Sequence, residues 1–304
     1  MTLQELRYLV AIADTRHFER AAEICHVSQP TLSLQLKKLE EHLNVPLLDR
    51  SQRQVTPTPT GEAIVAQARL VLAAAEEIYA LALKQRDPRV GALRLGIIPT
   101  LGPYLLPRLI PIIHAAFPQL RLWVREDLTN RLLEYLRSGR LDVIMLALPV
   151  HDEHLEVRLL FEEPFEVALP VSHPLTGHVQ IQEAALTHEP LLLLEEGHCL
   201  REQALAICGS PKRVAEFAAT SLETLCYMVA MGTGITLLPA LAGSFCAEPL
   251  RQTLLRLRPF APPAPTRKIG LVWRRHYTRE ETLIQLAELI DGHLPDGVFP
   301  LKKS

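Results

Sequence analysis

Residues 26–44 of this chain read HVSQPTLSLQLKKLEEHLN, and they decide the fold of its N-terminal part. Ser28 can cap a helix, because its hydroxyl can accept a hydrogen bond from a free N–H group of the first turn. Pro30 falls in that first turn, where the N–H group it lacks would have no partner. The apolar residues that follow recur at the spacing of one helix face: Leu32, Leu36, Leu39 and Leu43. The stretch therefore predicts a capped helix that ends near Asn44.

The flanking residues complete a helix-turn-helix. Apolar residues between Leu3 and Ala13 recur at helical spacing, and a second short helix is expected from Phe18 to Cys25. Residues 46–56, PLLDRSQRQVT, are typical of a small hairpin. We therefore predict a winged helix-turn-helix over residues 1–58, a motif that places its last helix in the major groove of DNA.

A long helix is expected next. Residues 60–86 are rich in Ala, Leu and Glu, and Asp87-Pro88 stops the run. At about 1.5 Å per residue this helix would span roughly 40 Å. Its apolar residues lie nearly all round, which is more than one buried face needs. We predict that residues 59–87 form a linker helix that pairs with a second copy of the chain.

From Gly91 onward, short strands alternate with helices. This order predicts a mostly parallel sheet with helices on both faces. The strands are expected at 92–98, 120–126 and 142–146, and the helices at 104–116 and 131–138. A similar pattern resumes over 163–258, and a strand at 268–274 with a helix at 279–293 would complete the first half.

This alternation predicts an α/β domain of two lobes over residues 88–304, with a fold like that of periplasmic binding proteins. Lobe I would comprise residues 88–161 and 267–304, and lobe II residues 162–266. A cleft between two such lobes is a usual site for a small ligand.

Composition narrows the class of protein. Apolar residues make up 48% of the chain, which suffices for sizeable cores. The chain has 32 basic and 34 acidic residues, so it lacks the excess of positive charge that is typical of many DNA-binding domains. The prediction of DNA binding therefore depends on the helix-turn-helix pattern of residues 1–58. The N-terminus lacks the pattern of a signal peptide or membrane span, and five cysteines without an export signal favour a reducing compartment. We predict a cytoplasmic protein without a membrane partner, a metal site or a cofactor.

The N-terminal residues closely resemble those of LysR-type transcriptional regulators. The matching positions are Leu3–Tyr8, His17-Phe18, Ala21-Ala22, Val27–Ser33, Leu39-Glu40, Leu47–Arg50 and Thr58–Gly61. The linker helix and the two-lobed domain also agree with this family in order and length. The resemblance implies a homo-oligomer, assembled as a dimer of dimers, that binds double-stranded promoter DNA and contacts RNA polymerase.

The expected DNA contacts lie on the third helix and the wing. They are Gln29, Pro30, Thr31, Ser33, Lys37 and Arg50. Gln29 could bond an adenine through both atoms of its amide. Lys37 lies one helical turn beyond Ser33, and Arg50 would reach phosphate or the minor groove. The alternative, that Thr31 and Ser33 are merely exposed residues at a helix start, stays open.

Residues 196–208, EGHCLREQALAIC, resemble the peroxide-sensing members of the LysR family. Further matching blocks lie at 98–107, 220–225, 232–240 and 267–272. The resemblance implies that Cys199 and Cys208 form a redox-active pair, reset by thiol reductants such as glutaredoxin or thioredoxin. It assigns the binding of peroxide to Thr100, Thr129, His198 and Arg267. We interpret Cys25, Cys226 and Cys246 as structural.

The residues around Cys199 agree with that chemistry. Gly197-His198 is typical of a helix start, and the free N–H groups and dipole of a first turn favour a thiolate. Arg201 and Arg267 would add positive charge. A thiolate attacks peroxide to give a sulfenic acid, which a second thiol converts to a disulfide.

The spacing of the two cysteines predicts a switch. On a continuous helix, Cys199 and Cys208 would lie on opposite faces and about 13 Å apart along the axis. A disulfide needs Cα atoms roughly 4.4–6.8 Å apart. The helix must therefore break for the bond to form.

The sequence thus predicts a DNA-binding regulator, not an enzyme, that senses hydrogen peroxide and controls antioxidant genes. One alternative keeps the regulator and replaces the signal by a small metabolite in the cleft between the lobes. A thiol peroxidase is a second alternative, against which the DNA-binding module argues. A periplasmic solute-binding protein is a third, against which the missing signal peptide also argues.

Overall fold

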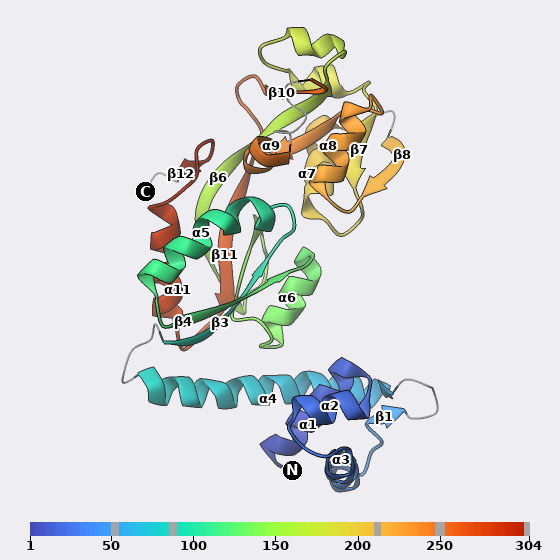
Figure 1. The fold of residues 1–304 in the computed structure, drawn as a ribbon, viewed down its shortest axis with the longest axis vertical. Helices are drawn as coiled ribbons and strands as arrows, with labels where there is room; N and C mark the ends of the chain where they lie inside the picture. Colours follow the sequence, from blue (N-terminus) through green and yellow to red (C-terminus); the bar gives the residue numbers. More distant parts are fainter. Residues whose placement is uncertain (50–54, 85–89, 210–213, 247–252, 301–304) are drawn as a thin grey trace. The chain divides into compact units, whose positions relative to one another are not determined.

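The structure, a computed structural model, describes residues 1–49, 55–84, 90–209, 214–246 and 253–300. The chain divides into two compact units. The N-terminal unit comprises residues 1–88 with 137–140, and the C-terminal unit comprises the rest (Figure 1). Of the predicted features, residues 85–89 at the end of the long helix and Arg50 in the wing lie outside the described residues.

The N-terminal unit begins with three helices, at the positions that the sequence predicts. They are α1 (Leu3–Thr15), α2 (Phe18–Ile24) and α3 (Gln29–Leu43). Their shared core includes Leu9, Ile12, Leu32, Leu36 and Leu39, all fully buried. Strand β1 (Leu48–Asp49) pairs antiparallel with β2 (Thr56–Pro57), so the described part of the predicted wing is a hairpin.

Helix α4 spans Pro59–Lys84. Thr58 caps it, because its Oγ1 accepts a hydrogen bond from the Gly61 N–H at 2.9 Å. A side chain at Gly61 would meet the Leu47 carbonyl oxygen, which explains the glycine. Arg69 donates through both terminal guanidinium nitrogens to Asp14 of α1 and so ties α4 to the first helix.

The C-terminal unit is built on a sheet of eight strands. Strands β3 (Gly91–Ile97), β4 (Leu120–Glu126) and β5 (Val143–Leu148) run parallel. Helices α5 (Gly102–Ala116) and α6 (Thr129–Arg137) connect them. The chain leaves this half through the long strand β6 (Leu155–Pro170) and returns through β11 (Thr266–Arg274).

The prediction of a mostly parallel sheet is correct for these first three strands and wrong for the sheet as a whole. Strand β11 pairs antiparallel with both β5 and β6. Strands β9 (Thr236–Pro239), β10 (Leu255–Pro259) and β12 (Phe299–Pro300) also pair antiparallel with β6. The physical reason is that β6 and β11 carry the chain out and back in opposite directions, which makes the sheet mixed.

The remaining elements pack around the far half of β6. A small parallel sheet consists of β7 (Leu191–Leu194) and β8 (Val214–Ala219). The α-helices there are α7 (Cys199–Cys208), α8 (Leu222–Ala230) and α9 (Ala240–Cys246). The short 3-10 helices are η1 (Pro174–Gly177) and η2 (Glu183–Leu186), and α11 (Glu280–Asp291) packs beside β6 and α5. One continuous core fills the whole C-terminal unit.

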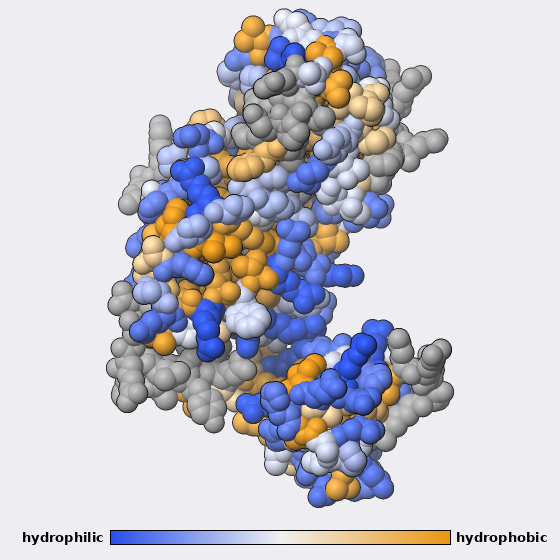
Figure 2. Space-filling view, in the orientation of Figure 1, coloured by the Kyte–Doolittle hydropathy of each residue, from blue (hydrophilic) through white to orange (hydrophobic). Residues whose placement is uncertain are grey.

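Apolar side chains also reach the surface of the C-terminal unit. Figure 2 shows them gathered over α5. Between α5 and α11 lies an apolar groove lined by Pro111, Ile112, Ala115, Ala116, Leu289 and His293. Among the described residues, no helix combines the length and apolar character needed to cross a membrane.

Candidate functional site

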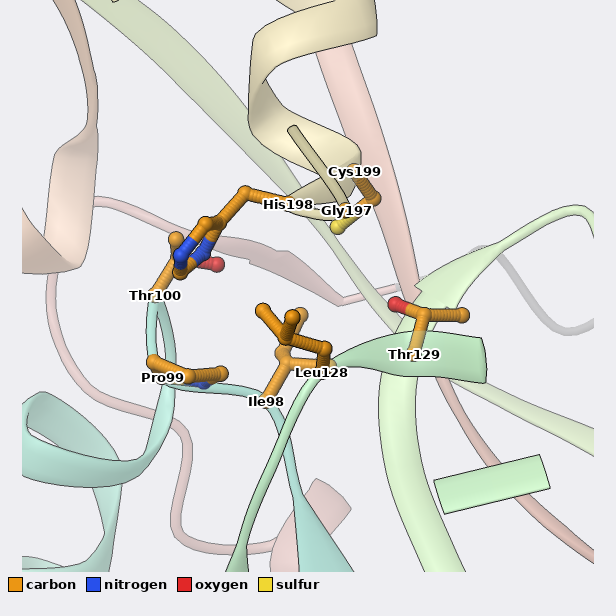
Figure 3. A pocket seen from close by; sticks show the side chains of 8 residues that line it. All are labelled: Ile98, Pro99, Thr100, Leu128, Thr129, Gly197, His198 and Cys199. Carbon is orange, nitrogen blue, oxygen red and sulfur yellow. The ribbon is translucent and has the colours of Figure 1, made fainter. Parts of the chain in front are cut away.

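A small pocket lies where three segments of the C-terminal unit meet. It is narrow, because the side chains leave almost no free space for a water-sized molecule. The lining residues come from the loop after β3 and from the starts of α6 and α7: Ile98, Pro99, Thr100, Leu128, Thr129, Gly197, His198 and Cys199 (Figure 3). Three of the predicted peroxide-binding residues and one predicted redox cysteine therefore share one cavity.

Cys199 is the first residue of α7, as the sequence predicts. Gly197 precedes it with a φ of +95°, a conformation that favours glycine. The thiol is partly exposed, and Figure 3 shows its sulfur directed into the pocket. This position lies at the end of the helix that has free N–H groups and the positive end of the helix dipole.

His198 is the residue before α7, and its side chain is buried beside Thr100 in the pocket wall (Figure 3). Burial lowers the pKa of His198, and the nearby Glu195 carboxylate only partly opposes this. The ring is therefore neutral near pH 7. A neutral imidazole has one donor and one acceptor nitrogen, so it can exchange a proton with a group in the pocket.

Thr129 is the first residue of α6. Its hydroxyl oxygen is buried and has no hydrogen-bond partner in the described protein. Figure 3 shows this oxygen directed into the same space as the Cys199 sulfur. A buried hydroxyl without a partner costs about 1–3 kcal/mol, and such groups gather at functional sites. The geometry favours a small polar ligand that would satisfy this hydroxyl.

Thr100 is fixed from behind by Arg267 of β11. The Arg267 Nη1 donates to Thr100 Oγ1 at 2.9 Å, and Nη2 donates to the Thr100 carbonyl at 3.0 Å. Arg267 does not belong to the described pocket lining. It is buried in an ion pair with Glu163, with Nη2 and a carboxylate oxygen 2.7 Å apart. Arg267, which the sequence assigns to the pocket, therefore lies behind Thr100 rather than in the pocket wall. The Glu163 carboxylate neutralises its charge.

Arg201, expected to add positive charge near Cys199, is also engaged elsewhere. Its Nη1 donates to the Leu194 carbonyl at 3.0 Å. Neither of the two arginines expected to add positive charge lines the pocket beside Cys199.

Cys208 is the last residue of α7, and its side chain lies in the core with 3% of its surface exposed. Burial, reinforced by the Glu183 carboxylate, raises the pKa of Cys208 to about 11. Both cysteines are free thiols. Because α7 runs unbroken between them, their Cα atoms are separated by about 13 Å along the axis. A bond between them requires α7 to unwind.

Two buried groups near the site were missed by sequence reasoning. Gln203 lies one helical turn beyond Cys199, and its Oε1 is buried without a partner in the described residues. The four-residue spacing from Cys199 could have identified it. Glu163, the partner of Arg267, has no local signal in the sequence.

A second cavity of about 160 Å³ shares Pro99, Thr100 and His198 with the first. Glu126 and Glu223 also line it. Burial raises the pKa of Glu126, and the Glu223 carboxylate adds to the effect. The Tyr104 hydroxyl donates to Glu223 at 2.8 Å. This cavity lies between residues of the two predicted lobes, where the sequence places the alternative small-molecule effector.

Neither of the other two cysteines whose side chains the structure describes, Cys25 and Cys226, lines this pocket. Cys226 is fully buried in α8, and Cys25 is partly buried at the end of α2. The Cys246 side chain lies outside the described residues. No cluster of three or more His, Cys, Asp or Glu side chains suited to a metal ion occurs in the described chain.

The predicted DNA contacts lie mostly on the exposed face of α3. Gln29, Pro30, Thr31 and Lys37 are exposed, and Ser33 is half-buried. Ser28 caps α3 by accepting from the Thr31 N–H, and its hydroxyl lies 2.8 Å from that of Thr31. The Thr31 hydroxyl therefore already has a partner. Lys37 lies 3.7 Å from Glu41 in an exposed pair that DNA phosphates could displace.

Comparison with known proteins gives matches over nearly the whole chain. The family model described as bacterial regulatory helix-turn-helix protein, lysR family, matches residues 3–62, and that described as LysR substrate binding domain matches residues 86–295. The DNA-binding transcriptional dual regulator OxyR of Escherichia coli (strain K12) is 46% identical over 299 residues, covering 96% of this chain and 97% of that protein.

Solved structures agree. A full-length cysteine-to-aspartate mutant of Pseudomonas aeruginosa OxyR is 41% identical, with a TM-score of 0.84, and the match covers 100% of this chain and 98% of that one. A hydrogen-peroxide-bound cysteine-to-serine mutant of Corynebacterium glutamicum OxyR is 36% identical, with a TM-score of 0.66, and the match covers 96% of this chain and 92% of that one. The resemblance stated from the sequence is confirmed.

Proposed function

This chain belongs to the LysR family of transcriptional regulators, and we propose that it senses hydrogen peroxide through Cys199 and responds by changing the transcription of antioxidant genes. One observation carries the proposal. Cys199 begins a helix and faces a small pocket that also contains the unpartnered hydroxyl of Thr129. A cysteine sulfur and an unpartnered hydroxyl directed into one narrow pocket can each contact one oxygen atom of a peroxide.

The first chemical step oxidises Cys199. The thiolate sulfur attacks one peroxide oxygen, so that an S–O bond forms and the O–O bond breaks. The leaving hydroxide takes up a proton and departs as water, while Cys199 becomes a sulfenic acid. Thr100, Thr129 and His198 hold the peroxide, and Arg267 acts from behind Thr100.

The second step stores the signal. After α7 unwinds, the Cys208 sulfur attacks the sulfenic sulfur of Cys199, so that an S–S bond forms, the S–O bond breaks and a second water leaves. Because the helix must rearrange before the cysteines meet, oxidation is coupled to a change in the packing of the C-terminal unit. A thiol reductant such as glutaredoxin or thioredoxin reverses the bond.

The remaining assignments follow from family membership. Gln29, Pro30, Thr31, Ser33, Lys37 and Arg50 contact promoter DNA. Helix α4 acts as the linker that pairs two chains, and two dimers associate through regulatory domains of the periplasmic-binding-protein type. In a reducing cytoplasm the protein acts stoichiometrically rather than as an enzyme, and it contacts RNA polymerase.

The test is peptide mass mapping after addition of near-stoichiometric hydrogen peroxide, with free thiols alkylated under denaturing conditions. We expect rapid loss of both thiols and a linked Cys199–Cys208 peptide that a reductant reverses. Cys25 and Cys226, which lie outside the pocket, serve as internal controls and should stay alkylatable. If Cys199 and Cys208 also remain free while the protein still binds DNA, the signal is instead a metabolite in the second cavity.

A further inference from the structure

Glu163 lies where the two long strands of the C-terminal unit pair. It stands directly opposite Arg267 in the antiparallel register of β6 and β11. Both side chains are fully buried. The Arg267 Nε donates to one Glu163 oxygen at 2.8 Å, and the Leu241 N–H of α9 donates to the other at 2.8 Å. The carboxylate is therefore held on both sides and cannot turn freely.

The Glu163–Arg267 pair determines how the Thr100 hydroxyl can hydrogen-bond to a ligand in the pocket. A guanidinium only donates hydrogen bonds, so Thr100 Oγ1 must be the acceptor of the bond from Arg267 Nη1. A hydroxyl has one proton, and a bond accepted from behind leaves that proton to be donated. Because Thr100 lines the pocket, its proton is available to an oxygen bound beside Cys199.

We propose that Glu163 is a positioning residue for peroxide reduction: it holds Arg267 so that the bond accepted by Thr100 orients the Thr100 hydroxyl to donate its proton to the peroxide. The inference rests on the proposed function. Two guanidinium nitrogens, Nε and Nη2, contact the Glu163 carboxylate and fix the guanidinium plane, which aims Nη1 at Thr100. Without the carboxylate, Arg267 would be a buried charge without its partner, held at Thr100 by only its two bonds to that residue.

The orientation of the Thr100 hydroxyl should affect the reaction of Cys199 with peroxide more than its reaction with an alkylating reagent. When the O–O bond breaks, negative charge develops on the leaving oxygen, and a donor aimed at that oxygen stabilises the transition state. Alkylation by iodoacetamide releases iodide, which needs no proton. Loss of the Thr100 donor should therefore slow the reaction of Cys199 with peroxide and leave its alkylation rate unchanged.

The test compares Glu163→Gln with Glu162→Gln in the full-length protein. Glu162 is the matched control, because it lies one residue earlier on β6 and makes a more exposed pair with Lys268 at 3.7 Å. We expect Glu163→Gln to lower the rate constant for oxidation of Cys199 by peroxide about tenfold or more, the scale of a small misplacement of a reacting group. Its iodoacetamide rate should match that of the wild type, and Glu162→Gln should change neither rate.

A double-mutant cycle tests the route through Thr100. Thr100→Val should itself slow peroxide oxidation, and Glu163→Gln should then cause no further loss. Should Glu163→Gln fail to fold, Glu163→Asp keeps the buried charge while withdrawing the carboxylate by one methylene. It should show a smaller loss with the same dependence on Thr100.

Three outcomes overturn the inference: a wild-type peroxide rate in the folded Glu163 variant, an equal loss in the Thr100→Val background, or a parallel loss of alkylation, which indicates a merely structural role. Slow peroxide oxidation of the wild-type protein is a different result. It overturns the proposed function and the role of Glu163 together.

Discussion

The two ends of helix α7 carry the same side chain in opposite surroundings. Cys199, at the N-terminal end, is partly exposed and faces a polar pocket. Cys208, at the C-terminal end, is buried in an apolar core with its pKa raised to about 11. Burial therefore favours the thiol at Cys208, whereas Cys199 lies beside the free N–H groups of the first turn.

This difference separates the two steps of a redox switch. In the proposed mechanism, peroxide reaches the Cys199 sulfur directly, whereas the buried Cys208 thiol stays protonated and about 13 Å away along the helix axis until α7 unwinds. The order of the two oxidation steps thus follows from the positions of the two cysteines at opposite ends of a ten-residue helix. The predictions below either break this asymmetry or measure it.

The largest effect is expected from exchanging each cysteine for serine. Cys199→Ser should abolish peroxide oxidation at both positions, because the sulfur that attacks peroxide is gone. Cys208→Ser should keep the first step and accumulate Cys199 sulfenic acid without an intramolecular disulfide. Trapping with a sulfenic-acid reagent, read by mass spectrometry, distinguishes them. Equal oxidation of Cys208 in the Cys199→Ser variant would contradict the division of roles.

Thr129→Val should slow peroxide oxidation of Cys199 by about 10²-fold, the usual cost of one lost donor at a reaction centre. The same change should stabilise the protein by about 1 kcal/mol, because it removes a buried hydroxyl that has no partner. Stopped-flow oxidation and denaturant unfolding measure the two effects. A slower reaction with lower stability would point to disrupted packing rather than to a peroxide contact.

The raised pKa of Cys208 predicts slow alkylation. At pH 9, about 1% of Cys208 should be thiolate, against about half of an ordinary thiol, so alkylation in the folded Cys199→Ser variant should be roughly 50-fold slower than in the denatured chain. Peptide mass mapping gives both rates. Similar rates would show that Cys208 is accessible before α7 unwinds.

The same pKa has a consequence for stability. Because the folded-state pKa lies above the ordinary value of 9.0, the folded state binds the Cys208 proton more tightly than the unfolded state. This contribution is complete below pH 9 and is lost as the pH rises toward 11, with a size on the order of 2 kcal/mol. The difference in unfolding free energy between the wild type and Cys208→Ala should shrink over that range.

The smallest effect is expected from loosening α7 without touching either cysteine. Ala206 is exposed on this helix, so Ala206→Gly should destabilise it by about 1 kcal/mol. If unwinding precedes the disulfide, bond formation should accelerate roughly fivefold, while oxidation of Cys199 stays unchanged. Ala66→Gly, an equivalent change at an exposed position of α4, is the control. Unchanged disulfide formation in Ala206→Gly would mean that unwinding does not limit the rate.

Structural features that depend on residues close together in the sequence were predictable from the sequence alone. The Ser28 cap, the leucine stripe of α3 and the position of Cys199 at a helix start depend on residues within a few positions of one another. The distance between Cys199 and Cys208 along the helix axis was also predictable, because it follows from their nine-residue separation and the rise per residue of an α-helix. Such features are local, because a cap or an apolar stripe is made by adjacent turns of the same segment.

Features that join distant segments required the tertiary structure. Packing between segments far apart in the chain produces four such features. They are the mixed sheet, the burial of Cys208, the Thr129 hydroxyl without a partner in the described residues, and the position of Arg267 behind Thr100. Thr100 and Arg267 are 167 residues apart, and Glu163 meets Arg267 only through the register of β6 and β11. Sequence spacing carries no information on that register, so the residue proposed to orient the pocket became visible only once the strands were paired.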